Sequence, residues 1–373
     1  MRRTQFINLP LHYGHAPAYL IRRMTKLSYA MCKVIIDEYG QQEFLRRLSD
    51  PVWFQAFGCV LGFDWHSSGI TTVVTGVLKQ SLSQDVHGIS IAGGKGSRSR
   101  SAMADIPVLG ESLGLSGAKI DSLLYASKMS AKVDSAAVQD GYSLYHHVIL
   151  FDERGDWAVV QQGMDAQSRM ARRYHWISDG LKEFVNEPHA GIICGQKTDG
   201  ALDMTAAGSN ESRQVCLDLA RDGHSGLKSS IYRIACKNTL DDWIGDSGIV
   251  HNTTGYEMPR HLDWDLFRRI YDVQPKNYEE LVGMQGVGAA IVRALALVAE
   301  LIHGARASWR DPVKYSFAHG GKDGVPHPVA RKVYDQSIKY LSGAIEGAEI
   351  EREERMSALR KLASFSSQMF PQS

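Results

Sequence analysis

The sequence lacks the features that mark several classes of protein. Its five cysteines are scattered over 373 residues, and no two form a CxxC pair. Neither a disulfide framework nor a thiolate zinc site is therefore expected. No run of about 18 apolar residues is present to cross a membrane, and the stretch MRRTQFINLPLHYG has no apolar core typical of a secretory signal. These absences favour a cytoplasmic protein without a membrane partner.

An excess of charge of one sign is also missing. The 42 Lys and Arg residues nearly cancel the 41 Asp and Glu residues, so net charge does not indicate a nucleic-acid partner. A DNA-binding face would have to be a local basic patch. Apolar residues make up 44% and charged residues 22% of the chain, as in ordinary globular proteins. The length allows two domains.

Hydrophobic periodicity gives the outline of the fold. Residues 17–48 show helical spacing, and residues 144–162 read as a β-hairpin around the turn DERGD. From about residue 256 one helix follows another. We therefore predict an α+β fold with a mixed α/β domain over residues 1–255 and an all-α, helix-hairpin-helix glycosylase-like domain over 256–345. The boundary lies between 245 and 260, and residues 346–373 form a charged carboxy-terminal helix.

The segment NYEELVGMQGVGAAIVRALALVAELIH, residues 277–303, predicts two helices joined by a tight turn. Asn277 followed by Glu280 is typical of a helix start, and MQGVG supplies the turn. Gly286 and Gly288, on either side of Val287, allow backbone N–H groups to approach a phosphate at a helix N-terminus. The pattern resembles the helix-hairpin-helix DNA-binding motif. The alternative is a helical corner that binds nothing.

The helix-hairpin-helix DNA glycosylases continue from such a hairpin to a Val-Asp pair that begins another helix. Here Val329 and Ala330, in GVPHPVARKVYDQSI, occupy the corresponding place, and Ala330 lies 44 residues after Gly286. That spacing is longer than usual, and an inserted SFAHGGKDG loop explains it. Bifunctional glycosylases carry a lysine two positions after the second glycine. Ala290 stands there, so the resemblance implies a monofunctional enzyme without Schiff-base chemistry; the alternative is that Lys322 substitutes for the missing lysine.

A second resemblance covers residues 9 to 340. The stretches DPVWFQAFGCVLGFDWHSSGITTVVTG, AGGKGSRSR, AKVDSAAVQDGYSLYHH, WAVVQQGMDAQSRMARRYHW and YSFAHGGKDGVPHPV are similar to those of a prokaryotic family long described as a domain of unknown function. A member of that family resembles a phage-defence DNA glycosylase that removes glucosylated hydroxymethylcytosine. The resemblance implies aspartate as the usual residue at position 330.

Cleavage of an N-glycosidic bond places positive charge on the sugar, which a carboxylate stabilises. Ala330 cannot supply that carboxylate, so either this chain is impaired or a neighbouring acid substitutes. Asp323 and Asp335 are the two candidates, although Asp335 lies on another face of the helix. Both are otherwise solvated surface charges.

Contacts with double-stranded DNA carrying a flipped, modified nucleotide are expected from the hairpin and from glycine-rich or basic segments. The candidates outside the hairpin are Lys95, Arg98, Arg100, Arg172, Arg173, His319, Gly320, Gly321 and Lys322. The candidate base pocket consists of Asp64, Trp65, His66, Tyr174 and Trp176. The alternatives are mobile loops with solvated lysines, and aromatic rings packed inside the protein.

A metal site is not expected, because the histidines form no HxH or HxxxH pair. No other cofactor is indicated, and the sequence does not identify a protein partner. The sequence therefore predicts a DNA glycosylase. The rival interpretation is a DNA-structure-binding protein or a metal-dependent nuclease, with His66 or His146 near the metal, that uses the hairpin only as an anchor.

Overall fold

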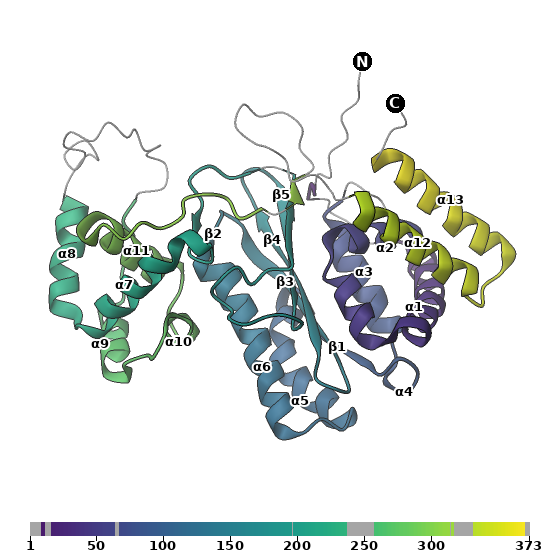
Figure 1. Cartoon of the computed structure of the whole chain (residues 1–373), viewed down its shortest axis with the longest axis horizontal. Coiled ribbons are helices and arrows are strands. Elements are labelled where there is room, and N and C mark those ends of the chain that lie inside the picture. The colour runs from purple at the N-terminus through teal and green to yellow at the C-terminus, as the bar shows by residue number, and fades with distance from the viewer. Residues whose placement is uncertain are drawn as a thin grey trace, which may run out of the picture.

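A mostly antiparallel sheet divides the molecule into two helical layers (Figure 1). In the computed structural model its strand order, over the residues that the structure describes, is β1-β3-β4-β5-β6-β8, and only the β6–β8 pair is parallel. The strands are β1 (Ile89–Lys95), β3 (Ser143–Asp152), β4 (Trp157–Asp165), β5 (Met170–Ile177), β6 (Gly191–Cys194) and β8 (Tyr315–Ser316). The described residues are 9–11, 16–63, 67–195, 197–236, 257–313, 315–316 and 331–369.

The β3–β4 hairpin confirms the prediction for residues 144–162. The Asp152 carboxylate accepts hydrogen bonds from the backbone N–H groups of Arg154 and Asp156, both at 2.9 Å. Gly155 takes a positive φ of 87°, which glycine adopts without strain. The turn therefore sets the register that places Ile149 opposite Val159.

One face of the sheet is covered by α1 (Ala18–Leu48), α2 (Pro51–Leu61) and α3 (Gly69–Ser81), with α4 (Gln84–His87) below them. The helix predicted for residues 17–48 is confirmed as α1, although Gly40 interrupts it with a φ of 82°. Asp50 caps α2, because its carboxylate accepts from Val52 N at 2.7 Å and Trp53 N at 3.2 Å.

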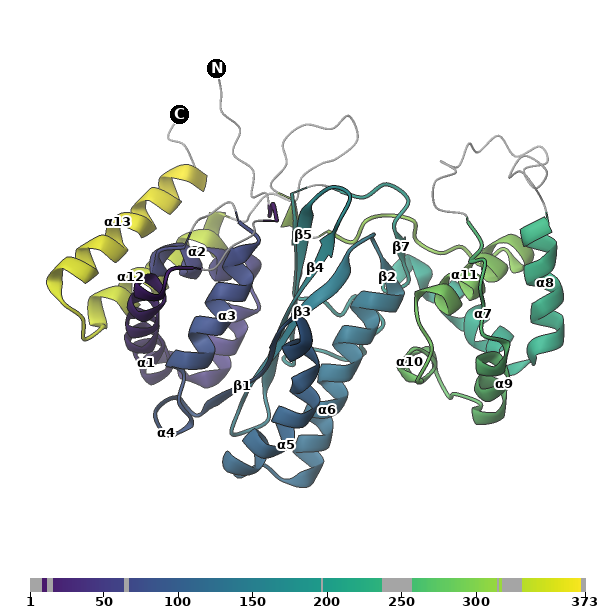
Figure 2. The ribbon, with the colours of Figure 1, turned by 180° about the vertical axis from the view of Figure 1, so that it is seen from behind.

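The opposite face is covered by α5 (Ala102–Ser112) and α6 (Gly117–Lys132), as Figure 2 shows from behind. A 3-10 turn, η1 (Gly96–Ser101), leads into α5, and a π-helical turn, η2 (Val133–Ala137), follows α6. The short strands β2 (Val138–Gln139) and β7 (Leu202–Asp203) pair with each other outside the main sheet.

Beyond α6 lies a second helical unit. Its members are η3 (Ala207–Ser209), α7 (Asn210–Arg221), α8 (His224–Cys236), α9 (Trp264–Val273), α10 (Tyr278–Gly283) and α11 (Ala289–His303). Their apolar side chains share one core with α5 and α6, which includes Phe267, Leu281 and Leu295. The helices expected on both sides of residues 284–288 are therefore confirmed.

The packing does not follow the predicted domain boundaries. The helices α7 and α8, expected in the first domain, pack against α9 and α11. Conversely, α12 (Arg331–Gly347), expected beside the hairpin, packs on α1 and α2 through Leu341 and Ile345. The last helix, α13 (Arg352–Met369), lies over α2. Each helix packs into the core that its apolar face fits. The order of the helices along the chain does not indicate which of the two cores that is.

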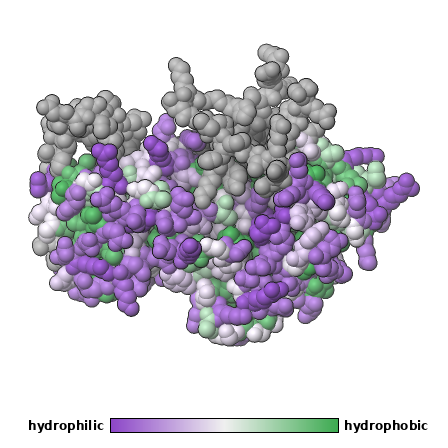
Figure 3. Space-filling model, in the orientation of Figure 1, coloured by the Kyte–Doolittle hydropathy of each residue, from purple (hydrophilic) through white to green (hydrophobic). Residues whose placement is uncertain are grey.

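The chain has the predicted α+β fold, with cores on both sides of one sheet. On the face in Figure 3, polar and apolar residues are interspersed over the described surface. Among the described helices, none is both long and apolar enough to cross a bilayer.

Candidate functional site

The turn between α10 and α11, residues Met284 to Gly288, is the clearest candidate site. The Asn277 side chain begins α10 by accepting from Glu280 N at 2.8 Å, as predicted. Gly286 has a φ of 93°, and a Cβ built there would lie 3.3 Å from both methyl carbons of Leu266. Glycine is therefore required at 286 by the fold itself.

Gly288 is different. Its φ of −136° is ordinary extended backbone, and among the described residues an added Cβ would meet nothing closer than the Gly286 carbonyl at 4.0 Å. Neither the backbone conformation nor the packing of the described residues demands glycine there. The missing side chain leaves the first turn of α11 open to a ligand.

The carbonyl groups of this turn face the body of the protein. The Lys132 ammonium, at the end of α6, donates to Met284 O at 3.2 Å and to Val287 O at 2.6 Å. The Gln139 amide donates to Ala289 O at 2.9 Å. The Val287 side chain is fully buried and anchors the turn. The carbonyl side of the turn is thus occupied by the protein.

The outer side of the turn exposes the start of α11. Gln285, Gly286, Ala289 and Ala290 are exposed, and Gly288 supplies no capping side chain to α11. The first N–H groups of a helix lack partners within it and attract anions. Arg269 on α9 is exposed, and its guanidinium lies 3.5 Å from the place of a Cβ at Gly286. The arrangement suits a phosphate group.

A cavity of about 330 Å³ is lined by the connection between β5 and β6, from Ile177 to Ala190. This connection is tied to α10, because Phe184 N donates to Glu279 Oε2 at 2.7 Å. Tyr125 OH donates to the other oxygen of the same carboxylate at 2.6 Å. The connection to which the cavity belongs is therefore fixed to the helix that precedes the turn.

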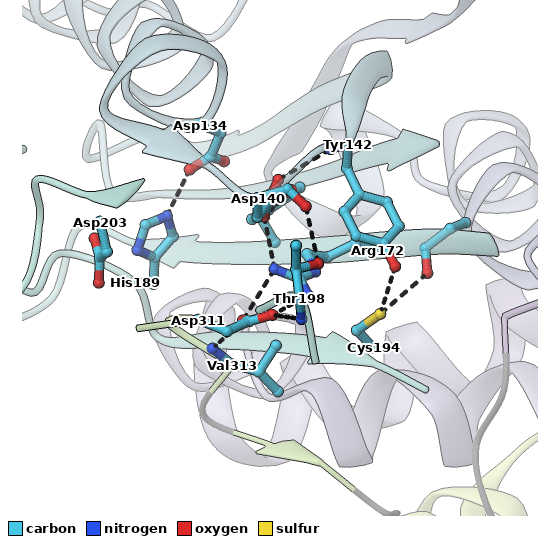
Figure 4. Close-up of polar contacts among 12 residues, drawn as sticks. Asp134, Asp140, Tyr142, Arg172, His189, Cys194, Thr198, Asp203, Asp311 and Val313 are labelled. Carbon is cyan, nitrogen blue, oxygen red and sulfur yellow. Dashed lines mark hydrogen bonds and ion pairs between the residues drawn. The ribbon is translucent and has the colours of Figure 1, made fainter. Parts of the chain in front are cut away.

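His189, in the wall of that cavity, belongs to a buried polar network (Figure 4). Its Nε2 lies 2.5 Å from Asp134 Oδ1. Trp176 Nε1 donates to Asp134 Oδ2 at 3.0 Å, and Gln161 Nε2 donates to the same oxygen at 2.6 Å. Burial raises the pKa of Asp134, although His189 and Trp176 act in the opposite direction. The donors hold this carboxylate firmly inside the protein.

The basic segment AGGKGSRSR occupies the end of β1 and η1, where Lys95, Arg98 and Arg100 are exposed as expected. Asp105 accepts from Gly93 N at 3.1 Å and from Ser101 Oγ at 3.0 Å. A carboxylate of the chain thus already binds the backbone N–H of Gly93.

Arg172 and Arg173, expected to contact a DNA strand, are fully buried on β5. Arg172 pairs with Asp140 at 2.7 Å and with Asp311 at 2.6 Å, and its guanidinium lies over the Tyr142 ring (Figure 4). The neighbouring strands and α2 enclose Arg173, which donates to Gln55 Oε1 at 3.0 Å, and burial lowers its pKa to about 9. Both arginines serve the interior instead.

Tyr174 and Trp176, expected in a base pocket, are also fully buried on β5. Tyr174 OH donates to Asp140 Oδ2 at 2.7 Å. Asp335 is exposed on α12. The remaining predicted site residues lie outside the described part of the chain; they are Asp64, Trp65, His66, His319, Gly320, Gly321, Lys322, Asp323 and Ala330.

Sequence reasoning missed Lys132, Gln139 and Arg269, which surround the turn in space but come from three distant segments. It also missed the polar network inside the sheet. The successive polar residues Gln161 and Gln162 in an apolar strand were a signal, because neighbouring residues of a strand face opposite sides.

The family comparison covers most of the chain. The model of the family described as "Protein of unknown function (DUF763)" matches residues 5–329. No curated protein matches the chain, and neither does any solved structure. The extent of the family match shows that this chain belongs to the DUF763 family.

Proposed function

We propose that this protein is a monofunctional DNA glycosylase that excises a modified base. The observation that carries the proposal is the turn Met284–Gly288, whose outer side presents the exposed start of α11 beside Arg269. Such a turn binds the DNA backbone without reading sequence. The glycosylase resemblance supplies the reaction, and the phage-defence member supplies glucosylated hydroxymethylcytosine as the first substrate to test.

The expected catalytic position is residue 330. A carboxylate about 4 Å from the developing sugar cation, at an effective dielectric near 20, contributes about 4 kcal/mol. That corresponds to roughly a thousandfold in rate. With alanine at this position, the chain is expected to bind its substrate and cleave it slowly. The position directly precedes Arg331, the first residue of α12.

Binding is tested with Gly288→Val. The φ of −136° suits a β-branched residue, so the variant should fold while its side chain blocks the approach of a phosphate. We expect DNA affinity to fall about tenfold, irrespective of sequence, in fluorescence anisotropy at fixed salt. Gly117→Val is the matched control, since Gly117 begins α6, an added Cβ has open space, and it lies roughly 22 Å along the helix from Lys132. Equal affinities would remove the turn from the DNA interface.

Activity is tested by comparing the chain with its Ala330→Asp variant on DNA carrying different modified cytosines. Single-turnover excision should be roughly a thousandfold faster with aspartate, at similar substrate affinity. Released bases are identified by mass, and abasic sites by strand cleavage in alkali only. Equal excision rates would move the search to Asp323 and Asp335. Metal-dependent nicking of the DNA without release of a free base would support the rival interpretation, a metal-dependent nuclease.

A further inference from the structure

Lys132 has an unusual place for a lysine. It is the last residue of α6, it is half-buried, and its ammonium is directed at two main-chain carbonyls of the turn. Burial lowers its pKa, and the neighbouring Lys128 acts in the same direction. A lysine that bound DNA directly would instead extend its ammonium into solvent.

The contacts of Lys132 determine which way the amides of the turn point. In a trans peptide unit the C=O and the following N–H point in opposite directions. When Lys132 holds Met284 O and Val287 O toward the body, the N–H groups of Gln285 and Gly288 point away from it. Gln139 does the same for the N–H of Ala290 by holding Ala289 O.

We propose that Lys132 is a positioning residue that aims the amides of the turn at a phosphate of the DNA backbone. The inference rests on the proposed function. It adds to the site a residue that lies behind the DNA-binding surface of residues 284–288. Lys132 acts through the peptide units of residues 284–288 and does not touch the DNA. Its positive charge compensates the carbonyl dipoles, so the opposite ends of the same peptides remain available to an anion.

The first test replaces Lys132 with methionine, which keeps the length of the side chain and removes its donor. We expect DNA affinity to fall about tenfold, the loss of one or more hydrogen bonds to a charged group. Lys128→Met is the matched control, since Lys128 is exposed on the same helix, one turn earlier. Unfolding in urea, measured in parallel, shows whether each variant is folded.

The salt dependence of binding separates positioning from direct contact. A lysine that neutralises a phosphate contributes about 0.9 to the slope of log K against log salt. Lys132→Met should lower affinity and leave that slope unchanged, whereas Arg269→Gln should reduce the slope by about one. A slope reduced by about one in Lys132→Met would show direct contact and overturn the inference.

A second variant, Lys132→Ala, leaves a space that a small alkylammonium ion can fill. Ethylammonium should restore affinity to this variant more than an equal concentration of sodium does, and it should not improve Lys128→Ala. Such a rescue would show that the missing ammonium, and not the missing aliphatic chain, lowers the affinity. If Gly288→Val weakens binding while both Lys132 variants bind normally, the positioning role alone is wrong. If all of them bind normally, the turn does not bind DNA and the proposed function fails with it.

Discussion

At the scale of single residues, glycine is present at positions 286 and 288 of the turn for different physical reasons. The sequence places both in one motif and cannot separate them. The structure assigns Gly286 to backbone conformation, with a φ of 93°, and leaves Gly288 in ordinary extended backbone. Gly286 therefore serves the fold, whereas under the proposed function Gly288 leaves room for a phosphate.

This difference predicts opposite effects on stability. Gly286→Ala should lower the free energy of unfolding by about 1–2 kcal/mol, because alanine is strained at positive φ and its Cβ presses on Leu266. Gly288→Ala should change it by less than about 0.5 kcal/mol. Urea unfolding of the two variants checks this. Similar losses in both would show that Gly288 also serves the fold.

The buried Arg172 gives a second prediction at this scale. Burial raises the pKa of Asp140, and Arg172 is the largest influence that opposes it. Arg172→Met would leave the carboxylates of Asp140 and Asp311 buried without their cation. We expect a loss of about 3–5 kcal/mol in the free energy of unfolding.

The control for Arg172→Met is the triple variant Arg172→Met, Asp140→Asn and Asp311→Asn. It removes the uncompensated charges and should recover much of the loss, as measured by urea unfolding. If the single and triple variants are equally unstable, packing against the Tyr142 ring, and not charge, explains the role of Arg172.

At the scale of elements, the strands and helices with clear periodicity could be predicted from the sequence. The helix α1, the β3–β4 hairpin and the pair α10–α11 agree with their predicted ranges to within a few residues. The segment RMARRYHW was misread because charged residues usually lie at the surface. As β5 it is buried on both faces, and Asp140 and Asp311 compensate Arg172 from separate loops. Such pairing across the chain leaves no local pattern.

The edge strand β1 offers a prediction about pH. Asp105 accepts from the backbone of Gly93, while Lys79 donates to the carbonyl of the same residue at 3.1 Å. Burial alone would raise the pKa of Asp105, but the hydrogen bonds from Gly93 and Ser101 and the Lys79 ammonium lower it below its ordinary value. The carboxylate therefore stabilises the fold when it is ionised.

A carboxyl group with a lowered pKa contributes stability above its unfolded pKa of about 3.9 and loses it as pH falls through the folded value. The chain should therefore be more stable than Asp105→Asn near pH 7, and the difference should shrink below about pH 4. Urea unfolding at several pH values measures it. A difference that persists in acid would show that the carboxylate charge is not what stabilises this edge.

At the scale of the whole molecule, the central sheet separates the two regions that the proposed function joins. The turn and α10–α11 lie on the α6 side, and α12 lies on the α1–α2 side (Figures 1 and 2). The sequence could not predict this, because residues 278–303 and 331–347 follow one another closely in the chain. Four layer spacings of about 10 Å, from the turn to α6, to the sheet, to α1–α2 and to α12, give a separation of roughly 40 Å.

That separation predicts how far a bound duplex must extend over the protein. One helical turn of duplex is about 34 Å long, so a duplex of little more than one helical turn that is held at residues 284–288 can also reach the start of α12. A photoreactive amino acid at the exposed Ala290 and another at the exposed Asp335 should therefore cross-link to the same short duplex. The exposed Glu111 at the far end of α5 is the control position and should give no adduct. Both adducts should form less efficiently in the Gly288→Val background, at a DNA concentration near the dissociation constant of the unaltered chain. If only Ala290 cross-links, DNA held by the turn does not reach α12, and the excision chemistry must lie on the α6 side, where the cavity walled by His189 is the first place to examine.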